Sequence, residues 1–222
     1  MDARDLFREQ LRITIGPALR DEGFAGSGSN WRRRNLHGDW ACINFQKTAW
    51  GSADSVSAYV NLSINPLSKH LFDAWFAGHP PAKQPSTADG LWFARLDPPN
   101  GASQSSAQPW DFGSGVSRNG VIGAMVDALQ SEAIPSLNSL LDRGFLFTLL
   151  ADAASGQVKG GHLETWSRPA MRALLLSDDG PSPELDNLLE SLEEEAAVET
   201  DEDWAGRLNG AVAWIRQRVI AA

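Results

Sequence analysis

The chain has 222 residues with a formal net charge of −9, and its 42% hydrophobic content is ordinary for a soluble globular protein. The acidity is uneven, because residues 178–203 hold 12 acidic side chains and no Lys or Arg. This balance, with no basic stripe, argues against a nucleic-acid partner, whose affinity would come mostly from phosphate neutralisation. No apolar run approaches the ~20 residues of a membrane-spanning helix, so we expect no membrane insertion.

The cysteine content and the first residues bear on the compartment. Cys42 is the only cysteine, so the chain has neither an internal disulfide nor a multi-cysteine metal site. The first ten residues, MDARDLFREQ, are charged and lack the apolar core of a signal peptide. We therefore expect a cytoplasmic protein.

The first element is a predicted helix over residues 2–22, in which apolar side chains recur on one helical face. These are Leu6, Phe7, Leu11, Ile15 and Leu19. Gly16-Pro17 should kink this helix, because proline removes one backbone hydrogen bond and clashes with the preceding turn. Gly23 is expected to end it in a left-handed cap.

The strongest pattern in the sequence is the alternation of apolar and polar side chains in residues 55–65, which predicts an antiparallel strand with one buried face. The apolar members are Val56, Ala58, Val60, Leu62 and Ile64. Residues 40–47 alternate in the same way, and residues 31–34 form a shorter run. A turn at His37-Gly38-Asp39 should join these two into a hairpin, which makes the three strands a meander.

The next segments mix a helix, a strand and a long loop. Residues 67–77 are predicted to be helical, with a buried side formed by Leu71, Phe72, Trp75 and Phe76. Residues 91–96 are a predicted fourth strand. Residues 97–117 are rich in Pro, Gly and Ser and read as a loop, in which residues 108–112 (QPWDF) are expected to dock as an extended piece.

From Arg118 onward the apolar period changes from two to 3.6, which predicts helices. They are expected near residues 118–141 with an interruption at Pro135, at 145–154 as a fully buried helix, at 169–176 with a Ser167 cap, at 183–197 and at 203–219. Strands followed by helices predict an α+β fold. We expect an antiparallel sheet of about four strands in the N-terminal half, covered by the N-terminal helix and a helical C-terminal half. The sheet region 1–117 and the helical region 118–222 should pack as a single domain.

The N-terminal third resembles a family of mostly bacterial proteins known as domain of unknown function 4304. The similar features are a helix ending in Gly23-Phe24, the run Trp31-Arg32-Arg33, residues 43–47 (INFQK) and the strand end at residues 61–65. The resemblance implies an α+β fold. It implies no activity, because the family name carries none.

The residues that could belong to a catalytic or metal-binding motif are better explained as surface or core positions. The four histidines are scattered, and His162 with Glu164 is better explained as a solvated pair than as metal ligands. Residues 156–161 have the glycines of a phosphate loop without its order. Cys42 lies in mid-strand, where a cysteine is usually an apolar filler. The acidic run is expected to be a solvated face. The sequence thus predicts no metal, no cofactor and no catalytic residue.

The remaining candidate is the polar side of the predicted sheet, which combines amides, a phenol, an indole and a guanidinium. The candidate residues for binding a ligand or partner are Trp31, Arg33, Asn44, Gln46, Tyr59, Asn61 and Asn65. Such side chains suit hydrogen bonding and stacking. They are equally typical of the wet side of an antiparallel sheet, or of amides that fasten the 97–117 loop.

Two hypotheses for function follow. The favoured one is a non-enzymatic binding or protein-interaction domain, by analogy with immunity and accessory proteins among acidic bacterial α+β domains. The alternative is an enzyme or sensor that binds a small polar ligand over the polar face. A deep pocket with a pKa-perturbed group would favour the alternative, and a flat exposed face would favour a protein partner. The identity of the partner and the oligomeric state stay open.

Overall fold

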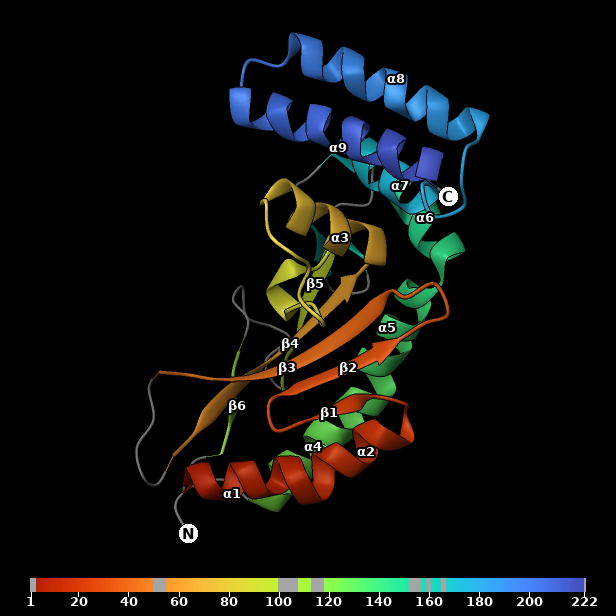
Figure 1. The fold of residues 1–222 in the computed structure, drawn as a ribbon. Coiled ribbons are helices and arrows are strands. Elements are labelled where there is room, and N and C mark those ends of the chain that lie inside the picture. The colour runs from red at the N-terminus through yellow and green to blue at the C-terminus, as the bar shows by residue number, and fades with distance from the viewer. Residues whose placement is uncertain are drawn as a thin grey trace.

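The structure is a computed structural model that describes residues 3–49, 55–99, 108–112, 118–151, 157–158, 161–164 and 167–221. An antiparallel sheet lies at its centre, in the strand order β1-β2-β3-β4-β5-β8-β7 with β6 beside β4 (Figure 1). The strands are β1 (Ala25–Ser27), β2 (Asn30–Arg34), β3 (Trp40–Lys47), β4 (Ser57–Asn65), β5 (Trp92–Leu96), β6 (Trp110–Asp111), β7 (Gln157–Val158) and β8 (Gly161–Leu163).

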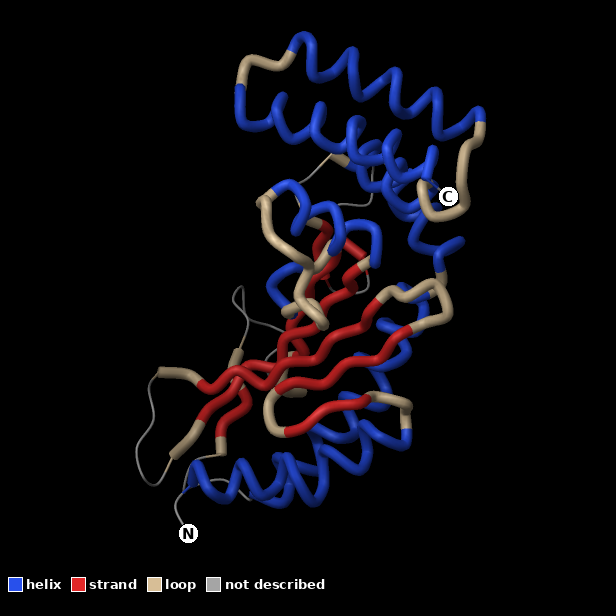
Figure 2. Tube along the Cα trace, in the orientation of Figure 1, coloured by secondary structure: helices blue, strands red, loops and turns tan. Residues whose placement is uncertain are grey.

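Helices precede the first strand, lie between strands along the chain and make up most of the second half of the chain, as Figure 2 shows. The α-helices are α1 (Ala3–Gln10), α2 (Gly16–Asp21), α3 (Leu67–Phe76), α4 (Arg118–Ala128), α5 (Ile134–Leu141), α6 (Arg143–Ala151), α7 (Arg168–Leu176), α8 (Pro183–Val198) and α9 (Glu202–Ala221). The π-helical segments η1 (Leu11–Ile15) and η3 (Leu129–Ala133) and the 3-10 helix η2 (Thr87–Asp89) complete the set. The predicted α+β class, with an N-terminal helix and a helical C-terminal half, is confirmed.

The four predicted strands are present as β2, β3, β4 and β5. The sheet also contains β1, β6, β7 and β8, which the sequence did not predict as strands because two or three residues carry no readable alternation. Residues 108–112 dock as expected, since β6 pairs with the start of β4 through Ala58 and Trp110. The rest of the 97–117 loop lies partly outside the described residues.

Both helices that contain an internal proline carry a π-helical turn just before it. In the first, the backbone N–H of Gly16 donates to the carbonyl of Leu11, five residues back, and Pro17 then occupies the first turn of α2. In the second, the N–H of Ile134 donates to Leu129 in the same way, ahead of Pro135 in α5. A wider turn relieves the clash between a proline ring and the preceding carbonyl, so the helix continues with a new segment.

One side of the sheet is the apolar side, as the alternation in β3 and β4 predicts. Ala41, Ile43 and Phe45 share it with Ala58, Val60, Leu62 and Ile64, and all of these side chains are at most 4% exposed. The helices α2 and α5 lie against it, α2 at Trp31 and α5 along β3 and β4. Burial of aliphatic side chains between the sheet and these helices supplies the main driving force for this layer.

The opposite side of the sheet is covered only at one end in the part of the chain that the structure describes. The segment from Pro85 through η2 to Gly90 lies over the end of β4. Beyond it, α3 contacts α7 and α9, so the C-terminal helices continue past α3 away from the sheet (Figure 1). The buried apolar cluster draws on residues of both halves, from Ala3 to Ile215.

Two burial predictions were wrong. Trp75 and Phe76 of α3 are 43% and 44% exposed, because the core side of this helix is formed by Phe72 and Ala74. The helix α6 is not fully buried either, since Phe145 is 38% exposed and Thr148 is exposed as well. Its predicted end, residues 152–154, lies outside the described residues.

Two of the C-terminal helices begin at serine caps, of which Ser167 was predicted from the sequence. The hydroxyl of Ser167 accepts from the N–H of Ala170 at the start of α7, and Ser182 accepts from Leu185 at the start of α8. The acidic helix α8 packs on α9 and α7 through buried leucines. Leu185, Leu189 and Leu192 form that buried stripe. The acidic residues of α8 therefore occupy its remaining faces.

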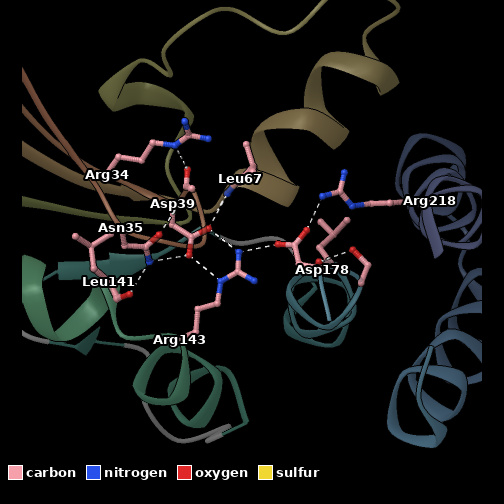
Figure 3. Close-up of polar contacts among 11 residues, drawn as sticks. Arg34, Asn35, Asp39, Leu67, Leu141, Arg143, Asp178 and Arg218 are labelled. Carbon is pink, nitrogen blue, oxygen red and sulfur yellow. Dashed lines mark hydrogen bonds and ion pairs between the residues drawn. The ribbon is translucent and has the colours of Figure 1, made fainter. Parts of the chain in front are cut away.

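A buried ion-pair network joins the β2–β3 turn to the helical half (Figure 3). The carboxylate of Asp39, 2% exposed, accepts from Nε and Nη2 of Arg143, each at 2.8 Å, and from the backbone N–H of Leu67 at 2.9 Å. Nη2 of Arg143 also donates to Asp178 at 2.6 Å, and Arg218 donates to the other oxygen of Asp178 at 2.6 Å. The network thus connects the sheet, α3, α6, the end of α7 and α9.

Candidate functional site

The strand register gathers polar side chains into one row on the side of the sheet that faces away from α2 and α5. Asn30 of β2 lies opposite Asn44 of β3, Asn44 opposite Asn61 of β4, and Asn61 opposite Arg95 of β5. Gln46 and Tyr59 form the next cross-strand pair. Because directly opposed residues share a face, these side chains form one surface. We call the surface formed by Asn30, Asn44, Gln46, Tyr59, Asn61 and Arg95 the amide face.

Hydrogen bonds between side chains run across the amide face from strand to strand. Asn44 Nδ2 donates to Asn30 Oδ1 at 2.9 Å, and Asn61 Nδ2 donates to Gln46 Oε1 at 2.9 Å and to Asn44 Oδ1 at 3.3 Å. Arg95 Nε donates to Asn61 Oδ1 at 3.2 Å. Each amide is therefore held in one orientation by its neighbours, although the surface itself is partly exposed.

Arg95 is held on the amide face by two neutral partners. Its guanidinium lies over the ring of Tyr59, 4.3 Å from the ring centroid, while its Nε is engaged by Asn61. Within the described residues, no atom accepts a hydrogen bond from Nη1 or Nη2, and no carboxylate forms an ion pair with this arginine. The outer nitrogens of the fork remain available to solvent or to a ligand.

The covered end of the same side is closed and holds Asn65. This residue is 1% exposed, and its Nδ2 donates to Ser63 Oγ at 2.9 Å and to Cys42 Sγ at 3.4 Å. Burial raises the pKa of the Cys42 thiol to about 11, which keeps it protonated at neutral pH. Asn65 is therefore placed in a small buried polar cluster and not on the open part of the face.

Trp31 and Arg33 lie on the other side of the sheet, which corrects the prediction that Arg33 shares a side with the amides and Trp31 lies near them. Trp31 pairs with Ile43, is 1% exposed under α2, and donates from Nε1 to the carbonyl of Gly28 at 3.0 Å. Arg33 Nη1 reaches Asn138 Oδ1 of α5 at 2.7 Å. Because β2 contains three consecutive arginines, its sequence shows no alternation of apolar and polar residues. Burial of the Trp31 indole instead determines which side chains of β2 face the core.

The sequence prediction missed two members of the amide face, Asn30 and Arg95. Asn30 follows from the corrected phase of β2, because it lies two residues from Arg32 on the same face. Arg95 had a readable signal, since Trp92, Ala94 and Leu96 alternate with Phe93 and Arg95 in a predicted strand. Of the predicted candidates, Asn44, Gln46, Tyr59 and Asn61 are brought together.

A pocket of about 270 Å³ lies at the β5 edge, and Arg95 of the amide face is one of the residues that line it. Leu62 and Leu96 from the apolar side of the sheet line it, together with Asp97, Glu132 and Ser136. Pockets that hold small molecules in proteins are usually about 300–1,000 Å³. The cavity is thus at or below the lower end of that range.

Neither a metal site nor a membrane-spanning helix is found in the described residues. No three or more His, Cys, Asp or Glu side chains in them are grouped so that they could hold a metal ion. Among the described helices, none combines the length and the apolar composition needed to cross a bilayer.

Comparison with known proteins identifies a family but no individual relative. No curated protein and no solved structure shows significant similarity to the chain. The family described as domain of unknown function (DUF4304) matches residues 15–139, a stretch that begins in η1, ends within α5 and contains every residue of the amide face. Because this match spans more than half of the 222 residues, the chain belongs to the DUF4304 family.

Proposed function

We propose that this protein is a non-enzymatic interaction domain that binds a protein partner through the amide face. The observation that carries the proposal is the ordered row of polar side chains from Asn30 to Arg95, oriented by mutual hydrogen bonds and yet partly exposed to solvent. Preorganised polar groups lose little conformational entropy when a partner binds, so their hydrogen bonds contribute more to affinity. A partner's backbone or polar side chains would find donors and acceptors at fixed positions.

The shape of the site favours a macromolecular partner over the alternative of a small polar ligand. The amide face is a sheet surface, and the described pocket at the β5 edge, which Arg95 also lines, is small for a ligand site. The Cys42 thiol is buried and protonated, which suits a structural role better than nucleophilic chemistry. These features support binding as the function.

The proposal places the protein in a bacterial cytoplasm. By analogy with other acidic bacterial α+β domains, its role there would be of the accessory or immunity type.

The test replaces the two central amides together, Gln46→Ala with Asn61→Ala. The double variant should lose capture of the partner from an extract of the native cells. Its free energy of unfolding should change by less than about 1 kcal/mol, as is usual for solvent-facing substitutions. Asn187→Ala with Gln217→Ala is the matched control, because it removes two exposed amides of α8 and α9.

The opposite result would identify the amides as structural. If Gln46 and Asn61 fasten a covering segment, the double variant should lose on the order of 1–3 kcal/mol for each buried partner left unpaired. Chemical denaturation of both double variants measures this directly. A large loss of stability, or capture that survives the change, would contradict the proposal.

A further inference from the structure

We propose that Arg95 is an oxyanion-binding point of the amide face, at which two oxygens of a carboxylate or phosphate group on the partner are bound. This inference rests on the proposed function and names the chemistry that the face recognises. A guanidinium matches such groups because its planar fork donates two parallel hydrogen bonds.

The orientation of Arg95 is fixed before any ligand arrives. Nε donates to Asn61 Oδ1, and the guanidinium plane is held over the ring of Tyr59 at 4.3 Å. Asn61 is in turn held by donating to Gln46 and Asn44. These contacts use one edge and one face of the guanidinium, so the Nη1 and Nη2 groups are left for a ligand.

The charge of Arg95 is not compensated within the described residues. The hydrogen-bond partner of Arg95 and the ring beneath it are neutral, and no carboxylate of the described residues forms an ion pair with this arginine, although Asp97 and Glu132 line the same pocket. Asp97 accepts from the backbone N–H of Gln108, and Asp111 accepts from Ser57. By contrast, the exposed Arg216 of α9 is already bound at two points by Glu193. An incoming anion at Arg95 therefore displaces no internal carboxylate.

Gln46 offers a second donor on the same surface. Its Oε1 accepts from Asn61, while its Nε2 donates to no atom of the described residues. Gln46 and Arg95 both contact the Asn61 side chain, so a group lying beside Asn61 is close to both. A neutral donor next to a cationic fork would strengthen binding of an oxyanion.

The experiment follows the Nε–Hε resonance of Arg95 by NMR in the full-length protein at low ionic strength. Sodium glutarate and inorganic phosphate are titrated separately, and sodium chloride at matched ionic strength is the blank. We expect a saturable shift at Arg95 with at least one of the two oxyanions, and the one that saturates identifies the source as carboxylate or phosphate. Arg95→Lys should weaken the binding, followed by the Gln46 side-chain amide, by about tenfold, because the fork is lost while the charge remains.

Arg20 provides the matched control within the same chain. It is also exposed and lies over an indole, Trp31, at 5.1 Å, but no hydrogen bond within the described residues orients its guanidinium. Arg20→Lys should leave the titrations unchanged. Equal shifts at Arg20 and Arg95, or shifts that chloride reproduces, would overturn the oxyanion site. If that happens while partner capture still depends on Gln46 and Asn61, the interaction proposal stands and only this inference fails. Capture that is indifferent to Gln46 and Asn61 removes the interaction proposal whatever Arg95 does.

Discussion

Asp39 and Arg143 form a two-point ion pair, with Nε and Nη2 of the arginine each 2.8 Å from a carboxylate oxygen, across a sequence separation of 104 residues. Asp39 lies in the β2–β3 turn, and Arg143 is the first residue of α6 (Figure 3). The pair therefore fixes the start of a C-terminal helix against the end of an N-terminal hairpin. Asn35 supports the same point, since its Nδ2 donates to Asp39 and to the carbonyl of Leu141.

Breaking this pair on one side should be costly. Asp39→Asn leaves the Arg143 guanidinium buried with half of its partners, and its Nη1 is already buried without an acceptor in the described residues. Removal of one member of a buried pair typically costs about 3–5 kcal/mol. Urea denaturation should therefore show a large drop in the free energy of unfolding for Asp39→Asn.

The control for this prediction is an exposed pair in the same protein. Asp5 and Arg8 of α1 lie 2.9 Å apart, with side chains that are 53% and 67% exposed. Exposed pairs are usually worth about 0–1 kcal/mol, so Asp5→Asn should have little effect. Equal losses for the two variants would show that the Asp39–Arg143 pair does not hold the halves together.

The same carboxylate should make stability depend on pH. Burial alone would raise the pKa of Asp39, but hydrogen bonds from Arg143, the Leu67 N–H and Asn35, with the charge of Arg143, outweigh burial and lower it. A carboxyl whose pKa is lower in the folded state stabilises the fold above its ordinary value of 3.8, and this contribution is lost as pH falls through the folded-state value.

The measurement compares the wild type with Asp39→Asn from pH 6 down to pH 3. The difference between their free energies of unfolding should be constant near neutrality and shrink as the pH falls below ordinary carboxyl values, because protonated Asp39 resembles asparagine. A difference that stays the same throughout would mean that the charge of Asp39 does not contribute.

How far the sequence predicts this structure depends on whether a feature is local. The alternation in β3 and β4 predicted the buried side of the sheet, because a period of two directly reports which side chains face the core. The Ser167 position predicted a helix start for an equally local reason. The phase of β2 was not readable from three consecutive arginines, and it was decided by the burial of Trp31 under α2.

The candidate site was predicted in part for the same reason. Asn44, Gln46, Tyr59 and Asn61 lie on two strands whose alternation was clear, so their shared face followed from pairing in order. The role of Arg95 depends on its cross-strand hydrogen bond to Asn61 and on its position over the Tyr59 ring. These contacts follow only from the strand register. The Asp39 network was invisible in the sequence, because its members come from distant segments and Asp39 had the appearance of an ordinary turn residue.

The last prediction concerns the acidic segment 178–203, in which like charges crowd on α8. Some of its acids are neutralised by arginines from other helices, as Glu184 is by Arg172 and Glu193 by Arg216. Glu190 and Glu194 are exposed, lie four residues apart on the helix surface, and pair with no base among the described residues. Like charges at this spacing destabilise a helix by about 0.2–0.5 kcal/mol.

Glu190→Gln with Glu194→Gln should therefore raise the free energy of unfolding by a few tenths of a kcal/mol at low salt, and Glu193→Gln should lower it by a similar amount because it breaks the pair with Arg216. Both effects should fade in 1 M NaCl, where the screening length is about 3 Å. Amide hydrogen exchange in α8 of the wild type should slow as salt is added, because repulsion among the unpaired acids weakens. Exchange that is slow and indifferent to salt, together with no gain from the double substitution, would show that the arginines of the neighbouring helices already balance the charge of this helix.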